Sequence, residues 1–127
     1  MPKFSKQSLN RLQSCDERLF KLFNEVVKHF DCTILEGRRT VERQSMLVKQ
    51  GKSKTMNSKH LTGKAVDVAP YPINWEDRER FTYFAGFVMG IASQQGLKLR
   101  WGGDWDKDTD LADNSFDDLP HFEIVGE

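Results

Sequence analysis

Residues 58–70 read SKHLTGKAVDVAP, and this stretch decides both the fold and the site that we predict. Its second half alternates strictly, which predicts a strand over residues 65–69. Side chains alternate between the faces of a strand, so two valines would enter a core while Asp67 lies between two alanines on the opposite face. The small alanines leave room above the carboxylate, and a metal ion is the natural occupant.

Residues with the chemistry of a catalytic zinc site are spread over the chain. Such a site takes three protein ligands, drawn from histidine nitrogens and carboxylate oxygens, and a water. His60 and Asp67 stand in the stretch above, and His121 begins a second predicted strand. Asp118 comes three residues earlier, and Pro120 stiffens the approach. Each residue alone is ordinary, but the combination favours a metal site in which Asp118 lies beside the ion as a general base.

The composition indicates one soluble globular domain. A chain of 127 residues, 38% hydrophobic and 30% charged, is long enough for one core and too short for two. A formal net charge of zero argues against a protein whose affinity comes from nucleic-acid phosphates. No apolar run approaches the roughly 20 residues of a membrane span, and polar residues 1–10 lack the apolar stretch of a signal peptide. We therefore expect no membrane insertion and synthesis in the cytoplasm.

Hydrophobic spacing and capping residues predict helices that flank a few strands. Asn74 is expected to cap the third helix with Asp77 at its third position, and Glu123 is expected beside a ligand or at the surface. The irregular order of elements predicts an α+β fold with a small antiparallel sheet and about three helices. The predicted helices are residues 8–30, 41–50 (capped by Thr40) and a segment that Gly96 closes, and the predicted strands are residues 32–36, 65–69, 97–101 and 121–125.

The motifs SxHxxGxAxD, from Ser58 to Asp67, and DxxHxE, from Asp118 to Glu123, resemble those of a known family. They are similar to the zinc peptidases of the D-Ala-D-Ala carboxypeptidase and L-alanyl-D-glutamate endopeptidase group, which share a fold with the hedgehog signalling domain. The resemblance extends to GRRT at residues 37–40, to Pro70-Tyr71 and to LRWGGDW at residues 99–105. It is strongest to phage endolysins that consist of one small catalytic domain.

The resemblance implies roles for individual residues. Asp118 matches the catalytic acid/base. Arg39, rather than the adjacent Arg38, matches an arginine near the metal that stabilises the oxyanion or a substrate carboxylate. Ser58 matches a serine that contacts substrate. The residues that match the zinc ligands are His60, Asp67 and His121.

The function implied by the resemblance is that of a zinc-dependent endolysin that cleaves the L-Ala–D-Glu bond of peptidoglycan stem peptides. We expect residues 1–127 to form a single, monomeric catalytic domain without a wall-binding domain. It would be made in the host cytoplasm and reach the wall after another protein opens the inner membrane. The alternatives are a D-Ala-D-Ala carboxypeptidase or dipeptidase on the same scaffold, and a non-catalytic hedgehog-like module that keeps zinc for structure.

The acidic stretch Asp104–Asp110 invites a second metal prediction. Its alternating aspartates resemble the start of a calcium loop, but Thr109 and Ser115 replace the glycine and the glutamate of an EF-hand. An irregular Ca²⁺ site and a solvated acidic loop are both consistent with this stretch.

The tryptophans and the lysines near the predicted site each allow two interpretations. Trp101 and Trp105 either wall a substrate cleft or pack over a sheet edge, and the four lysines of residues 52–64 either attract substrate carboxylates or are solvated.

Overall fold

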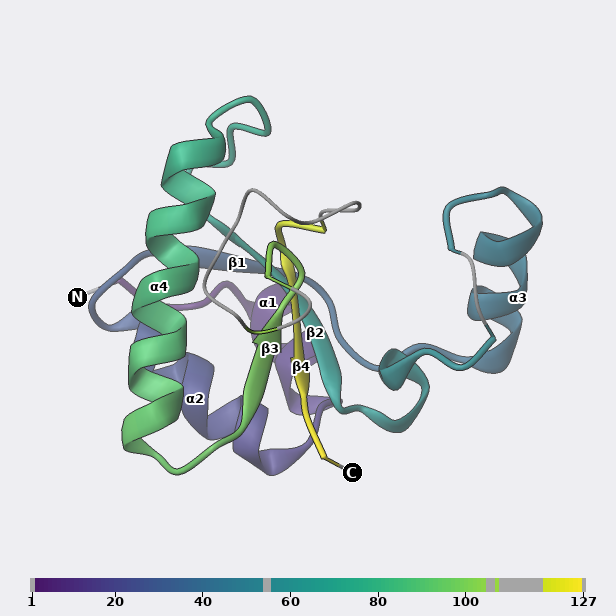
Figure 1. The fold of residues 1–127 in the computed structure, drawn as a ribbon, viewed down its shortest axis with the longest axis horizontal. Helices are drawn as coiled ribbons and strands as arrows, with labels where there is room; N and C mark the ends of the chain where they lie inside the picture. Colours follow the sequence, from purple (N-terminus) through teal and green to yellow (C-terminus); the bar gives the residue numbers. More distant parts are fainter. Residues whose placement is uncertain (1, 54–55, 105–106, 108–117, 127) are drawn as a thin grey trace.

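A four-stranded antiparallel sheet forms the centre of the computed structural model, which describes residues 2–53, 56–104, 107 and 118–126. The strand order is β1-β2-β4-β3, so β2 and β4 are central (Figure 1). The α+β prediction is confirmed, with four α-helices in the described residues instead of about three. The strands are β1 (Cys32–Glu36), β2 (Ala65–Pro70), β3 (Leu99–Trp101) and β4 (His121–Ile124). The helices are α1 (Lys6–Gln13), α2 (Glu17–Val27), α3 (Val41–Lys49), α4 (Arg78–Gln94) and the short 3₁₀ helix η1 (Lys59–Thr62).

The register between β2 and β4 brings together residues that are far apart in the chain. Asp67 is the direct cross-strand partner of His121, and Val66 is the partner of Phe122. Directly opposed side chains in an antiparallel pair have Cβ atoms about 5 Å apart on one face. The strand pairing therefore delivers Asp67 and His121 to the same place on one side of the sheet.

The hydrophobic core lies on the other face of the sheet. The two valines of β2 are fully buried, as the alternation predicted, and they pack with residues from α2 and α4. Phe122 is central, because its ring makes edge-on contacts with Phe23 at 5.6 Å and Phe84 at 6.2 Å. The core thus fixes which side of β2 and β4 carries the polar residues.

Helix α1 covers the outer edge of β1. The Ser8 hydroxyl accepts a hydrogen bond from the Ile34 N–H at 3.1 Å, and Arg11 donates from Nη1 to the Ile34 carbonyl at 3.1 Å. Both cysteines are free thiols: Cys32 is buried and Cys15 is half-buried. Within the described part of the chain, no helix combines the length and hydrophobicity that crossing a bilayer demands.

The prediction of one helix over residues 8–30 is wrong, because α1 and α2 are separate. The Ser14 hydroxyl donates to the Arg11 carbonyl at 2.6 Å where α1 ends, and Asp16 caps α2 by accepting from the Arg18 N–H at 2.9 Å. The break frees the Asp16 N–H to bond the Gly63 carbonyl at 2.8 Å. Apolar spacing continues across the break, so periodicity alone did not reveal it.

The start of α4 also differs from the prediction. Asp77, not Asn74, is the N-cap, and its carboxylate accepts from the Arg80 N–H at 3.1 Å. The Asn74 side chain instead closes a turn by accepting from the Glu76 N–H at 3.1 Å. Asn and Asp both cap helices well, so the sequence was compatible with a helix start at either residue.

Strand β3 begins two residues later than predicted, because Leu97 still donates to the Ala92 carbonyl at the end of α4.

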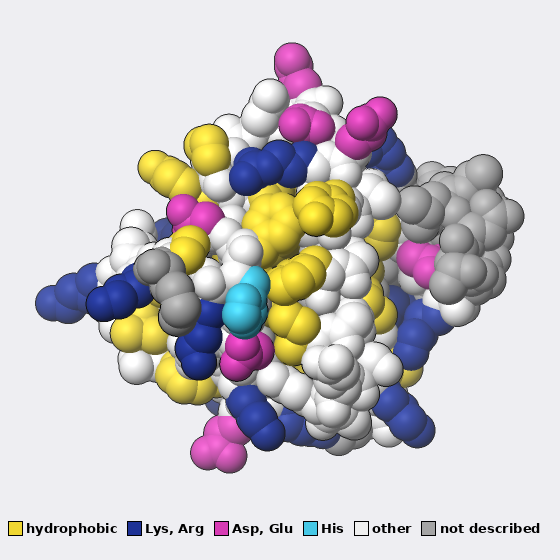
Figure 2. Space-filling view, turned by 90° about the vertical axis from the view of Figure 1, so that its left-hand side faces the viewer, with side chains coloured by type: hydrophobic (Ala, Val, Ile, Leu, Met, Phe, Trp, Pro, Cys, Tyr) yellow, Lys and Arg dark blue, Asp and Glu magenta, His cyan; other side chains and the backbone are white. Residues whose placement is uncertain are grey.

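An aromatic cluster lies on the side of the molecule that carries α4. Phe30, just after α2, packs against Tyr83 at 5.6 Å, Phe84 at 5.0 Å and Phe87 at 6.0 Å. Figure 2 shows hydrophobic side chains gathered on this side, with Lys and Arg side chains around them.

Helix α3 stands apart from the sheet on the opposite side of the molecule (Figure 1), and Thr40 caps it as predicted.

Candidate active site

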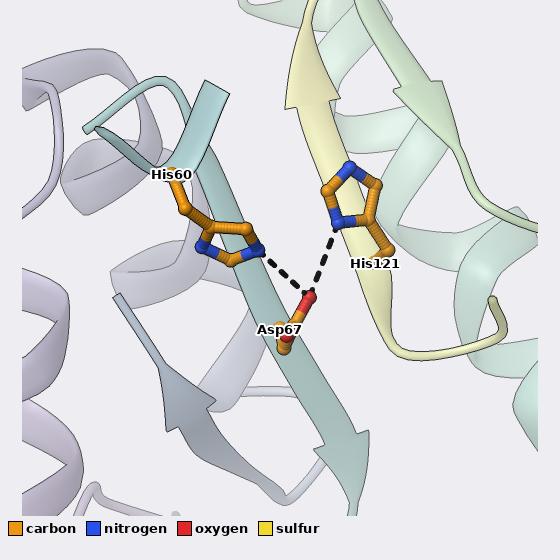
Figure 3. A group of neighbouring side chains, drawn as sticks. All are labelled: His60, Asp67 and His121. Atoms are coloured by element: carbon orange, nitrogen blue, oxygen red, sulfur yellow. Dashed lines mark hydrogen bonds and ion pairs between the residues drawn. The ribbon is translucent and has the colours of Figure 1, made fainter. Parts of the chain in front are cut away.

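Three side chains predicted as metal ligands converge above the sheet. Asp67 Oδ1 lies 3.2 Å from His60 Nε2 and 3.2 Å from His121 Nδ1. One ligand atom from each residue lies within 4.8 Å of the others, a grouping that could hold a metal ion. Both imidazole rings point at the carboxylate (Figure 3), and both histidines are buried. The three residues come from η1, β2 and β4, so the cluster forms only when the sheet does.

The outer hydrogen bonds of the histidines fix which nitrogens face Asp67. His60 Nδ1 lies 2.8 Å from the Gly37 carbonyl, and His121 Nε2 lies 2.8 Å from Glu123 Oε1. A carbonyl and a carboxylate only accept, so these two nitrogens carry hydrogens. In neutral rings, His60 Nε2 and His121 Nδ1 then present lone pairs to a carboxylate oxygen. Three converging lone pairs repel unless a proton or a cation lies among them.

The donor set fits a zinc ion. Two imidazole nitrogens and one carboxylate oxygen are ligands that zinc accepts, and ligating histidines usually donate their other N–H to a carbonyl or a carboxylate. The electrostatics of the cluster also favour positive charge. Burial lowers the pKa of His121, but its hydrogen bonds with Asp67 and Glu123 outweigh burial and raise the pKa to about 9. Burial opposes ionisation of Asp67, yet the two histidines hold its pKa below the usual range.

Local structure around η1 explains the position of His60. Ser58 caps η1, and its hydroxyl accepts from the His60 N–H at 3.2 Å. Gly63 ends η1 in a left-handed conformation with φ 75°. Gly37, whose carbonyl orients the ring, packs so tightly against α1 that a Cβ would lie 2.2 Å from the Arg11 carbonyl oxygen. The observed contact of Ser58 is therefore a helix cap, and its predicted substrate contact stays a prediction.

Asp118 lies beside the three donor atoms and not among them. Its Oδ2 is 4.0 Å from His121 Nδ1, and its side chain is 39% exposed. Its N–H donates to the Gly102 carbonyl at 2.8 Å, while the Gly102 N–H donates to the His121 carbonyl at 2.8 Å. Partial burial and, secondly, the charge of Asp67 raise the pKa of Asp118. This carboxyl is therefore held close to the cluster with a side open to solvent.

Of the two adjacent arginines, Arg39 faces the cluster. Its Nη2 lies 3.6 Å from Asp67 Oδ2, whereas Arg38 is exposed. The Arg39 guanidinium donates to both oxygens of Glu36 at 2.7 and 3.1 Å and to Gln44 Oε1 at 2.9 Å. These partners hold a positive charge rigidly behind Asp67 and leave Oδ1 as the oxygen that faces the histidines.

Several residues at the site were not predicted from the sequence. Gln44, Glu36 and Gly37 act through contacts between separate elements, for which the sequence carries no spacing signal. Glu123 carried a signal, because it lies two residues after His121 and shares its face of β4. Glu123 was expected either beside a ligand or at the surface. It contacts the His121 ring directly, which agrees with the first of these.

The predictions for the tryptophans, the lysines and the calcium loop concern residues around the cluster. Trp101, the last residue of the edge strand β3, is buried, and its Nε1 donates to the Leu119 carbonyl at 2.7 Å. Lys59 lies 3.6 Å from Glu123 Oε2, which makes it part of the site's support. Trp105 and most of the proposed calcium loop, including its aspartates at 106, 108 and 110, lie outside the described residues.

The sequence matches a family model and named relatives over most of its length. The model described as phage L-alanyl-D-glutamate peptidase matches residues 1–125. A protein of Escherichia phage T5 named L-alanyl-D-glutamate peptidase is 34% identical over 119 residues, which are 87% of this chain and 87% of that protein. A protein of the same name from Listeria phage A118 is 33% identical over 91 residues, which are 72% of this chain but only 29% of that protein.

Solved structures share the fold. The Serratia marcescens L-Ala D-Glu endopeptidase ChiX matches with a TM-score of 0.80 and 28% identity, over 97% of this chain and 90% of its own. A zinc complex of the D,D-pentapeptidase VanY from a VanB-type resistance cassette matches with a TM-score of 0.53 and 19% identity, over 91% of this chain and 71% of its own. At that identity, the second match shows the fold alone.

Proposed function

This chain belongs to the phage L-alanyl-D-glutamate peptidase family, and on that premise we propose that it is a zinc-dependent endolysin that hydrolyses the L-Ala–D-Glu bond of peptidoglycan stem peptides. One observation carries the proposal beyond family membership. One ligand atom each from His60, Asp67 and His121 lies within 4.8 Å of the others, and the carboxyl of Asp118 lies beside them. A structural zinc site needs no such carboxyl, whereas a hydrolytic site needs a base.

We assign the three ligand positions to His60 Nε2, Asp67 Oδ1 and His121 Nδ1. Zinc bound there would lower the pKa of a bound water to about 7 and polarise the scissile carbonyl. Asp118 takes the proton from the attacking water and passes it to the departing amine. Its place 4.0 Å from His121 Nδ1 supports this role, because the carboxyl is near the donors without being one of them.

Arg39 and Ser58 are proposed to act on the substrate. The fixed guanidinium of Arg39 supplies a positive charge for the oxyanion or for a substrate carboxylate. Its bonds with Glu36 and Gln44 support this role, since a preorganised charge needs no rearrangement during the reaction. The Ser58 hydroxyl accepts from His60 and keeps its own hydrogen to donate to substrate.

The proposed substrate also sets the place of action. We propose that residues 1–127 act as one monomeric catalytic domain on the cell wall, after synthesis in the host cytoplasm. We propose the peptide part of peptidoglycan as its substrate, and no nucleic acid as a partner.

Replacing Asp118 tests the catalytic assignment. Asp118→Asn keeps the shape of the side chain and removes the base, so hydrolysis of purified muropeptides should fall by about 10²–10⁴-fold. Zinc content and thermal unfolding should stay at wild-type values. Asp31→Asn, the same change away from the site, is the control and should keep full activity. Unchanged hydrolysis in Asp118→Asn would remove Asp118 from the mechanism.

The products of the wild-type protein separate the proposed function from its alternatives. Release of free D-Ala would identify a D-Ala-D-Ala carboxypeptidase or dipeptidase. Zinc binding without hydrolysis of any stem-peptide bond would identify a non-catalytic module.

A further inference from the structure

Glu123 is a buried carboxylate on the same face of β4 as His121. It is 7% exposed and lies two residues beyond the proposed ligand. Burying a carboxylate is unfavourable unless hydrogen bonds and opposite charges compensate. The contacts of Glu123 therefore indicate what keeps it there.

The two carboxylate oxygens of Glu123 have different partners. Oε1 accepts from His121 Nε2 at 2.8 Å. Oε2 accepts from Arg100 Nη2 at 2.7 Å and lies 3.6 Å from Lys59 Nζ. Arg100 is the cross-strand partner of Glu123 on β3, so the sheet itself places this pair. Cations thus hold one oxygen while the other faces the histidine.

Lys59 connects the segments that carry the two histidines. It lies in η1 directly before His60, and its ammonium also donates to the backbone carbonyl of Ile124 on β4. The Glu123 carboxylate is therefore a shared support for η1 and β4. Its loss would loosen both segments at the point where their side chains converge.

The two histidines have opposite orientations. His60 presents Nε2 to Asp67 because a backbone carbonyl holds its Nδ1, whereas His121 presents Nδ1 because Glu123 holds its Nε2. Only the second of these anchors is a side chain that substitution can remove. Glu123 is therefore the side chain that marks Nε2 as the protonated nitrogen of His121.

We propose that Glu123 is a positioning residue that fixes His121 in the Nδ1-coordinating tautomer, and that Arg100 and Lys59 hold Glu123 in place. The inference rests on the proposed metal site but not on the proposed substrate. Such partners of metal-bound histidines typically contribute about 10–100-fold to metal affinity.

The first test measures zinc affinity by competition with a chromogenic chelator. Glu123→Ala should bind zinc about 10–100-fold more weakly than wild type. Glu123→Gln keeps an acceptor oxygen but loses the charge, so its affinity should lie between the two. The matched control is Glu25→Ala, because Glu25 contacts His29 Nε2 at the same 2.8 Å on an exposed surface. The control should bind zinc like wild type.

A second measurement reads the tautomer directly. The chain has three histidines, so ¹⁵N spectra of the imidazole rings contain few signals to assign. Zinc-loaded wild type should show His121 bound through Nδ1 with a protonated Nε2, and His60 the reverse. Glu123→Ala should lose the protected Nε2–H signal of His121. If Glu123→Ala fails to fold, Glu123→Gln decides through its affinity and its weakened Nε2–H protection.

Wild-type zinc affinity in both Glu123 variants, or coordination by His121 Nε2, would overturn this inference alone. A wild-type protein that binds no zinc would overturn the proposed metal site and this inference with it. Neither measurement depends on activity on muropeptides. A failure of the proposed hydrolysis would therefore leave this inference about Glu123 untouched.

Discussion

Each side chain that we propose as a metal ligand is oriented by a second contact behind it. A carbonyl holds His60, a carboxylate holds His121, and the guanidinium of Arg39 lies behind Asp67. Such contacts restrict each side chain to one useful rotamer and one tautomer. The geometry of the cluster is therefore a property of six or more side chains and backbone groups, not of three.

Arg39 and Arg38 form a natural pair of test positions. Arg39→Ala should slow hydrolysis by about 100-fold, the usual loss when one group that stabilises developing negative charge is removed. Arg38→Ala should have no effect, because Arg38 is exposed. Steady-state rates on muropeptides measure both variants. Equal losses in the two would contradict the assignment of Arg39.

The residues of the site were predictable to the extent that chemistry and spacing define them. The proposed ligand types and the position of Asp118 follow from two short motifs. The orienting carbonyl of Gly37 does not, because any residue has a carbonyl, and only the close packing of Gly37 on α1 aims this one. The hydrogen bonds of Arg39 with Glu36 and Gln44 depend on how α3 packs near β1, which no local sequence pattern specifies.

Strand pairing and turns give these residues their positions. A slip of one residue between β2 and β4 would move Asp67 away from His121 and turn its side chain to the core. The sequence predicted the strands through their alternation. It did not predict the break between α1 and α2, because that break is set by caps and by the Asp16–Gly63 contact.

Gly102 allows the Asp118 backbone to approach the end of β3. A Cβ at position 102 would lie 2.0 Å from the Asp118 carbonyl oxygen, so Gly102→Ala should push Asp118 away and strongly reduce hydrolysis. Zinc content should persist, because Gly102 meets His121 only through a hydrogen bond to its backbone carbonyl, and the atoms nearest an added Cβ all belong to Asp118. Gly90→Ala is the control, since its Cβ meets nothing within 4 Å and alanine favours a helix by about 1 kcal/mol. Full activity in Gly102→Ala would show that this approach does not position Asp118.

The Asp16 cap of α2 should make stability depend on pH. Its hydrogen bond with the Arg18 side chain is the main cause that lowers the pKa of Asp16 from 3.8 to about 2. Because the folded value is the lower one, the contribution is complete above about pH 4 and disappears as the pH falls towards 2. Asp16→Ala should lower the free energy of unfolding by about 1 kcal/mol at pH 7. Urea unfolding at both pH values checks this, and a wild-type advantage that stays constant down to pH 2 would contradict it.

At the scale of the whole molecule, the hydrophobic core and the polar cluster lie on opposite faces of the sheet. Helices α2 and α4 pack with the core on one face (Figure 1), while the polar cluster lies on the other, where the side chains of His60 and His121 point at Asp67 of β2 (Figure 3). The α+β class and the antiparallel sheet followed from the order and pattern of the elements. The strand order β1-β2-β4-β3 did not, since it depends on long-range pairing between segments some 50 residues apart.

We propose that zinc on this face of the sheet drives cleavage between L-Ala and D-Glu. The most direct measurement is mass spectrometry of muropeptides digested by the protein after chelation, and again after one equivalent of zinc is restored. We predict no products from the chelated protein. After zinc is restored, we predict fragments that end in L-Ala together with peptides that begin at D-Glu. Cleavage that survives chelation, or products that show only the loss of D-Ala, would contradict the account.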